Sequence, residues 1–300
     1  GAEKKMAALE PRCREKQKEH RKDLIRIHMA VMLFGMSALF SRLIHQSAPV
    51  LTWGRVTVSS VFLFCLHRAK RTDDRVKSKK HLLGLFAVGG ILAGHWSAFF
   101  FSAQVSTVAV ATLTFSTFPV FVTFLEPWLF GLRLRASDVA AAFVMMFGVA
   151  LIIPDFSLDN SMTRGILWGM LGSFLYALMS LANRRFAGLY PATVISFYEQ
   201  GAAAVLLLPS LFLFRPLFSL SDLLLLLLLG TVFTGIAHSL FTSGMKTVRA
   251  QTAGMISGLE SVYGILFAGL LLGEIPGIRE IAGGAVILLV VFYSTKKAAS

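Results

Sequence analysis

Several long apolar runs of this chain contain ionisable side chains. Glu260 lies about ten residues into the run 250–272, which places it roughly 15 Å from one end if the run is a helix. His95 and His238 lie within two other apolar runs. An ionisable group at mid-membrane depth is costly unless it is paired or hydrated, so such a group typically marks a pathway for ions or solutes.

These residue types suit the recognition of a small polar solute. Glu260 can bind a substrate amine or carry a coupling proton, and Glu199, in another apolar run, is a second candidate for the proton. His95 and His238 can hydrogen-bond a substrate carboxylate or titrate near neutral pH. The alternative for each residue is structural, namely a carboxyl or imidazole that hydrogen-bonds a neighbouring helix only for packing.

Aromatic residues with a polar atom are expected to wall the same site, because they offer a flat apolar face. Packing alone is the alternative for the tyrosines, and Trp96 could instead belong to the aromatic belt at a membrane interface. Arg55 is expected to snorkel to the outer interface, although a cation there could also attract an anionic substrate. The predicted substrate-binding residues are His95, Trp96, Tyr176, His238, Glu260 and Tyr263, and the predicted proton-coupling residues are Glu260 and Glu199.

The composition indicates that lipid surrounds the elements that hold these residues. The chain has 300 residues, of which 55% are hydrophobic and 15% charged, and its mean hydropathy is +0.70, too apolar for one water-soluble core. Its apolar runs are unbroken, as in 223–229, where a barrel strand would alternate polar and apolar residues. We therefore expect an all-α integral membrane protein. The net charge of +13 sits in short blocks between these runs, which argues against nucleic acid as a partner.

Apolar stretches long enough to cross about 30 Å of hydrocarbon recur along the chain. Short connectors with proline and other helix-ending residues separate them and leave no room for a soluble domain. We predict ten transmembrane helices, at 24–44, 50–67, 82–102, 106–130, 136–153, 164–183, 192–213, 221–244, 250–272 and 279–295.

The distribution of basic residues predicts the orientation. If the N-terminus is cytoplasmic, the inner segments hold 24 of the 29 Lys and Arg residues, as expected for cytoplasmic loops. Both termini are then cytoplasmic, and residues 1–23 form a basic cytoplasmic tail. The compact layout favours a bacterial inner (plasma) membrane, which the chain crosses several times.

The chain aligns with itself without gaps when it is shifted by 142 residues. The aligned pairs include Arg42 with Arg184, Pro49 with Pro191, Ser97 with Ser239, Phe99 with Phe241, and Gly131 with Gly273. Each copy carries five predicted helices, and an odd number makes the second copy lie upside down relative to the first. We predict repeats at 24–156 and 164–296, with a substrate site near mid-membrane between them.

Two segments resemble a known family. The stretch 107–131, with Pro119 and the Glu126–Pro127 pair, is similar to the fourth helix of the EamA family of the drug/metabolite transporter superfamily. The stretch 252–274 is similar to its ninth helix. Two positions depart from the family pattern: Leu132 stands where Glu is frequent, and Ser261 stands where Pro is frequent. The second departure is expected to remove a helix distortion near the centre.

The resemblance implies a transporter with two inverted five-helix repeats that exports small metabolites such as amino acids, and it leaves the substrate open. We expect alternating access, with amino acids as the predicted substrate. No catalytic triad, zinc spacing or phosphate loop occurs, so we expect no enzyme activity, no metal and no cofactor. The expected partners are a small-molecule substrate and membrane lipids, and the protein is expected to be a monomer. The alternatives are a carrier of organic anions or of nucleotide or phosphorylated sugars, which would need paired cations at mid-depth, and a passive channel.

Overall fold

The computed structural model describes residues 2–131, 133–248, 253 and 256–299, and side chains from residue 14 onward except 294, 295 and 297–299. Leu132, the side chain of Cys13 and most of residues 249–255 in the ninth predicted span therefore lie outside the described residues. Every regular element in the described part is a helix, as predicted. The helices are α1 (Ala2–Ser37), α2 (Phe40–Leu43), α3 (Ala48–Lys70), α4 (Lys79–Val105), α5 (Val108–Phe115), α6 (Phe118–Phe130), α7 (Ala136–Ile152), α8 (Ser161–Ala187), α9 (Ala192–Phe214), α10 (Leu220–Gly230), the π-helix η1 (Thr231–Ile236), α11 (Ala237–Gly244), α13 (Glu260–Leu272) and α14 (Ile278–Ala299).

Many of these helices are suited to a membrane by length and composition. Within the described residues, seven helical segments are long and apolar enough to cross one, and α7 and α13 are shorter apolar helices. Large apolar side chains also point outward, for example Phe143 on α7 and Phe212 on α9, which are 73% and 79% exposed. Such a surface suits lipid, because large apolar patches are rarely exposed to water in soluble proteins.

Polar residues at the helix starts explain where several helices begin. The side chains of Ser78 and Asn160 accept hydrogen bonds from first-turn amides of α4 and α8. Ser219 and Asp222 form a capping box at the start of α10. These contacts satisfy amides that would otherwise lack a partner, so the chain turns at the ends of the apolar runs.

The helix breaks repeat with the spacing seen in the sequence. A shift of 142 residues carries the bounds of α6, 118–130, onto those of α13, 260–272. Both helices end at a glycine in the left-handed region, Gly131 at φ 66° and Gly273 at φ 68°. Glycine adopts this conformation without steric cost, so both copies end this helix by the same means.

The expectation that Ser261 removes a central helix distortion is wrong. The chain forms a turn at Gly258 and Leu259, directly before α13. The Ser261 hydroxyl contacts α5 instead, where it donates to the carbonyl oxygen of Thr112 at 2.9 Å and lies 2.5 Å from the Ser116 hydroxyl. These bonds hold the first turn of α13 against α5, so the break does not depend on proline.

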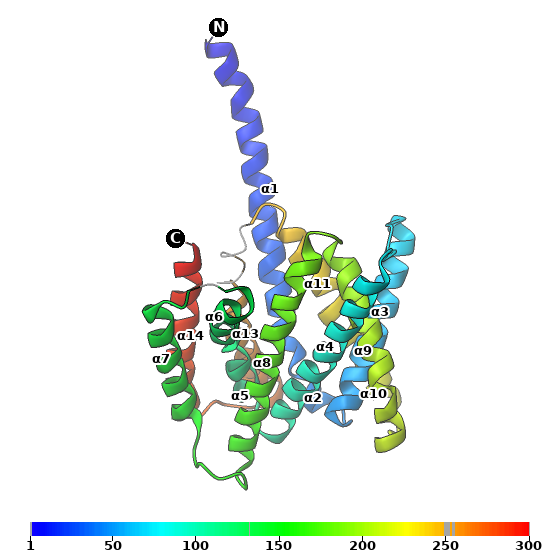
Figure 1. Ribbon diagram of the computed structural model, residues 1–300, viewed down its shortest axis with the longest axis vertical. Coiled ribbons are helices and arrows are strands. Elements are labelled where there is room, and N and C mark those ends of the chain that lie inside the picture. Colours follow the sequence, from blue (N-terminus) through cyan, green and yellow to red (C-terminus); the bar gives the residue numbers. More distant parts are fainter. Residues whose placement is uncertain (1, 132, 249–252, 254–255, 300) are drawn as a thin grey trace.

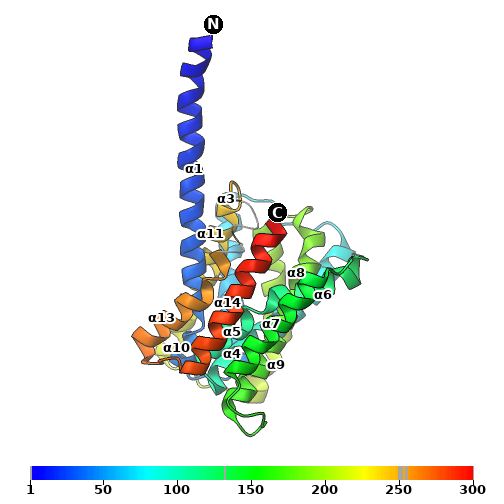
Figure 2. The ribbon, with the colours of Figure 1, turned by 90° about the vertical axis from the view of Figure 1, so that its left-hand side faces the viewer.

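The packing between the two halves is reciprocal. Helix α1 packs along α11 and α13, and its counterpart α8 packs along α4 and α5. Helices α7 and α14 pair at one edge of the bundle and α3 and α9 pair on the other side (Figures 1 and 2). Helix α1 begins, and α14 ends, at the same end of the bundle (Figure 1). We call this the terminal end and the other one the distal end.

The contact of α1 with α13 is very close. A Cβ atom on Gly35 would lie 2.6 Å from the carbonyl oxygen of Glu260 and 2.9 Å from the Cβ atom of Tyr263. Only glycine allows this approach, which fixes the start of α13 against α1.

Candidate functional site

A cavity of about 290 Å³ lies between the two halves of the bundle. It is lined by α1, α3, α4 and α5 from the first half and by α8, α9, α11 and α13 from the second. Asn183, Ala187 and Ala192 belong to its wall, so it reaches the terminal end, where α8 ends and α9 begins. The predicted residues that line it are His95, Trp96, Tyr176, Glu199, His238 and Glu260.

Tyr263 is the predicted substrate-binding residue that does not line this cavity. It packs instead against an apolar cluster that includes Ile27, Val31 and Ile256. The close approach of α1 at Gly35 covers this part of α13. The sequence places Tyr263 at the right depth, but only the tertiary contact decides which way it faces.

His95 is fixed by a hydrogen bond across the interface between the halves. Its Nδ1 lies 2.8 Å from the carbonyl oxygen of Gly172. A carbonyl only accepts, so Nδ1 donates, and in the neutral imidazole Nε2 then carries a lone pair and acts as an acceptor. In this state His95 can receive a hydrogen bond from a ligand but cannot donate one to a carboxylate.

Aromatic rings form much of the wall near His95. The Tyr176 ring centroid lies 5.0 Å from that of His95, 5.0 Å from that of Phe115 and 4.8 Å from that of Phe118. On another side of the cavity, His238 lies against Phe34 with a centroid distance of 5.1 Å. An apolar portion of a ligand would therefore meet ring faces and edges.

Arg55 does not snorkel to the membrane interface, contrary to the sequence-based expectation. It is only 3% exposed and lines the cavity. Its guanidinium carbon lies 3.9 Å from the centroid of the Trp96 ring, and its Nε donates to the hydroxyl of Thr234 at 2.9 Å. A cation over an indole face is stabilised by the ring quadrupole, which accounts for the inward orientation.

The same contact places Trp96 in the wall of the cavity and not in an interfacial belt, because the ring is only 7% exposed and is covered by the Arg55 guanidinium. Thr234 lies in the π-helix η1, where its hydroxyl also donates to the carbonyl oxygen of Leu229. No sequence pattern indicated this π-helix, and such insertions frequently occur at functional sites.

Two carboxyl groups face the cavity in different surroundings. Glu199 is 4% exposed and lies beside Asn183, while its Oε1 has no hydrogen-bond partner among the described residues. Gln200, next to it, also has an unpartnered amide oxygen. Glu260, at the start of α13, makes no hydrogen bond or ion pair with a described residue. Buried acceptors without partners are rare, so a ligand, water or proton is needed to satisfy the oxygens of Glu199 and Gln200.

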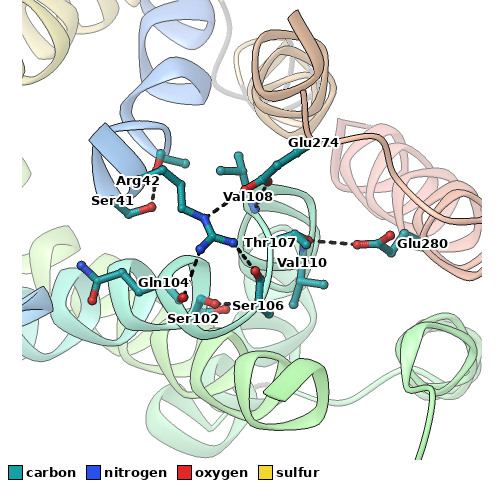
Figure 3. Close-up of polar contacts among 11 residues, drawn as sticks. Ser41, Arg42, Ser102, Gln104, Ser106, Thr107, Val108, Val110, Glu274 and Glu280 are labelled. Carbon is teal, nitrogen blue, oxygen red and sulfur yellow. Dashed lines mark hydrogen bonds and ion pairs between the residues drawn. The ribbon is translucent and has the colours of Figure 1, made fainter. Parts of the chain in front are cut away.

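A polar cluster lies at the distal end, and Figure 3 shows its contacts. Arg42 of α2 donates from Nε to Glu274 Oε1 at 2.9 Å, and from its two terminal nitrogens to the carbonyl oxygens of Gln104 and Ser106. Glu274 also accepts from the backbone amide of Val108 at 2.9 Å. We call these residues the Arg42 cluster. It joins the last turn before α5 in the first half to the end of α13 in the second half.

Arg184, the repeat counterpart of Arg42, also forms an ion pair, toward the terminal end. Its partner is Glu126 of α6 in the other half. The Arg184 side chain is 58% exposed, compared with 33% for Arg42. The ion pair with Arg184 gives Glu126 a structural role. The two halves are thus linked at both ends. The arginine at the distal end has more hydrogen-bond partners and is less exposed to solvent than the one at the terminal end.

Comparisons with known proteins give the family. The EamA-like transporter family matches residues 24–153 and 163–295. An uncharacterized transporter of Bacillus subtilis (strain 168), YxxF, is 24% identical over 270 residues, which are 88% of this chain and 86% of the relative. An uncharacterized transporter of Archaeoglobus fulgidus is 26% identical over 264 residues, which are 87% of this chain and 92% of the relative.

A solved crystal structure shares the fold, with a TM-score of 0.66 and 21% identity over 92% of this chain and 96% of that chain. The apolar helices identify a membrane protein that crosses the bilayer several times, and the family is one of transporters and not of enzymes. Because the family matches well over half of the sequence, this chain belongs to the EamA-like transporter family.

Proposed function

We propose that this transporter is a secondary active carrier that exports small metabolites, in particular amino acids, by alternating access. The cavity is the observation that carries the proposal. Both halves of the chain enclose it, it reaches the terminal end, and the Arg42 cluster joins the two halves at the distal end. A chamber with access from one end is what a carrier offers in one of its two states, whereas a channel needs a continuous path.

The proposal includes ten crossings, arranged as inverted repeats at 24–156 and 164–296, with both termini in the cytoplasm and the protein in the inner membrane. The reciprocal packing supports the inverted arrangement, because two copies related by a pseudo-twofold axis must make each contact twice. The basic residues of the inner segments support the orientation. In this orientation the cavity is open to the cytoplasm, and export begins with loading from that side.

The roles of the cavity residues follow from their surroundings. Trp96, Tyr176 and His238 wall the site, and Tyr263 supports α13 from behind in the observed state. His95 and Glu260 provide polar contacts to the substrate. Glu260 or Glu199 carries the coupling proton, because a carboxyl oxygen without a protein partner, such as Oε1 of Glu199, can exchange a proton as the cavity changes access. A small-molecule substrate and lipids are the partners, and a monomer contains the complete cavity.

Transport by purified protein in liposomes tests the function. We expect labelled amino acids to move against their gradient when a proton gradient is applied, and preloaded unlabelled substrate to drive counterflow, which a passive channel does not show. Protein that moves no amino acid under either condition would refute the proposed substrate class. If Glu260→Gln and His95→Ala both leave the rates unchanged, the proposed site is wrong.

A carrier of nucleotide or phosphorylated sugars agrees less well with the cavity. Among its described lining residues, Arg55 is the single permanent cation, while Glu199 and Glu260 are acids. A phosphate dianion would meet one cation and two carboxyl groups, so the charges of the site do not match it.

A further inference from the structure

Arg55 presents an unused hydrogen-bonding edge to the cavity. Its Nε donates to the Thr234 hydroxyl, and its guanidinium carbon lies over the Trp96 ring. The two terminal nitrogens make no hydrogen bond with a described residue, and no described carboxylate forms an ion pair with this guanidinium. Arg55 lines the cavity, so the free edge of the fork is available to a bound molecule.

This arrangement leaves a buried positive charge without a counter-charge in direct contact. Arginine keeps its charge at any physiological pH, whereas Glu199 and Glu260 can each take up a proton. A buried unpaired charge is strongly unfavourable, and the contacts with Trp96 and Thr234 compensate it only in part. A ligand with a carboxylate would satisfy the two free nitrogens together, because the spacing of the fork matches two carboxylate oxygens.

We propose that Arg55 is the anchor for the substrate carboxylate and that the site selects α-amino acids with an apolar side chain. This inference rests on the proposed function and deepens it. Glu260 lines the same cavity as Arg55 and accepts from the α-ammonium group. His95 offers an acceptor through Nε2, and the aromatic wall receives the side chain.

The inference assigns the carboxylate to a residue that differs from the one expected from the sequence. A neutral His95 whose Nδ1 donates to Gly172 has no proton left for a carboxylate. Arg55 has four N–H bonds on its two terminal nitrogens, and neither nitrogen has a described partner. In this assignment Arg55 selects the carboxylate of the substrate, and Glu260 selects its ammonium group.

Ligands that differ by one charged group test this assignment. L-Phenylalanine, phenethylamine and 3-phenylpropanoate share one apolar body, and L-leucine, 3-methylbutylamine and 4-methylpentanoate form a second trio. Apparent affinities are measured from the concentration dependence of thermal stabilisation of the purified full-length protein. We expect Arg55→Gln to weaken binding of the amino acids and carboxylates by between about 10-fold and about 150-fold, and to leave the amines nearly unchanged.

Two further variants separate recognition from folding. Arg164→Gln makes the same change at an exposed arginine outside the cavity, and should bind every ligand as the parent does. Arg55→Lys keeps the charge and loses the fork, so it should weaken binding of the carboxylates less than Arg55→Gln does. The ratio of amino-acid to amine affinity within each variant does not change if the variant is merely less stable.

The possible results distinguish this inference from the proposed function. If the parent transports amino acids and Arg55→Gln binds all three ligand types as the parent does, or weakens all three equally, Arg55 is not the anchor although the function stands. If the carboxylates bind through Arg55 but no amino acid is transported, the anchor stands and the proposed substrate class is wrong. If the parent binds only amines, or none of the six ligands, the inference is overturned.

Discussion

The Arg42 cluster should control access to the cavity from the distal end. Replacement of Arg42 by Gln removes the ion pair with Glu274 and the bonds to the carbonyl oxygens of Gln104 and Ser106. Of these contacts, the ion pair with Glu274 joins the two halves, so it should break when the distal end opens. Its loss then raises the free energy of the distally closed state and leaves the distally open state nearly unchanged.

The size of the effect follows from the partners and their exposure. The ion pair is partly solvated, with side chains 33% and 21% exposed, so it contributes about 1 kcal/mol, near the upper end for surface pairs. The bonds to the carbonyl oxygens of Gln104 and Ser106 lie within the first half, so they are not counted in this difference. A loss of about 1 kcal/mol corresponds to a shift of about 5-fold in the ratio of open to closed protein, since about 1.4 kcal/mol is a factor of ten.

Thiol labelling measures this ratio. Ser37 lines the cavity and is 3% exposed, so Ser37→Cys reports access once Cys13 and Cys65 are replaced by Ser. A membrane-impermeant reagent is added from the distal side. Arg42→Gln should raise the labelling rate by about 5-fold, while Arg184→Gln, which breaks the pair toward the terminal end, should not raise it. Equal rates for Arg42→Gln and its parent, with both proteins folded, would refute the reasoning.

Three other predictions concern the coupling proton and the packing. Glu199→Gln replaces a titratable side chain by an amide of the same shape. Initial transport rates in liposomes should therefore vary less across about pH 5 to 8 than in the parent. An unaltered pH profile would exclude Glu199 as the sole proton carrier. Gly35→Ala should lower the midpoint temperature of unfolding in detergent, because the added Cβ would lie 2.6 Å from a carbonyl oxygen of α13. Such overpacking costs about 1–3 kcal/mol. The control is Gly201→Ala, whose Cβ meets no atom within 4 Å. Ser261→Ala loses the hydrogen bond to Thr112 and should destabilise the protein by about 1 kcal/mol, and a midpoint equal to that of the parent would show that this bond does not hold α13.

The helical fold and the repeat could be predicted because both depend on patterns that are local in sequence. Apolar runs of sufficient length become helices in lipid whatever their neighbours are, and the 142-residue shift found in the sequence also relates the observed bounds of α6 to those of α13. The break before Glu260 could not be predicted from the absence of proline, because contacts of Ser261 with α5 hold the turn.

The composition of the cavity was partly predictable, since depth in the bilayer follows from position along a run. The six predicted residues that line it include His95, Trp96 and Glu260. The direction of a side chain depends on partners that are distant in sequence. Arg55 turns inward because Thr234 lies 179 positions away in the chain but within hydrogen-bond distance, and Tyr263 is covered because α1 has a glycine at residue 35.

The equivalent starts of α6 and α13 have a consequence for how such a protein changes its ligand. The two copies keep the same turn and the same terminal glycine, yet the first residue after the turn is Phe118 in one and Glu260 in the other. The two helices thus have equivalent backbones, but the first side chain of each differs. A new specificity can arise by exchange of one such side chain, while the backbone that changes access stays intact.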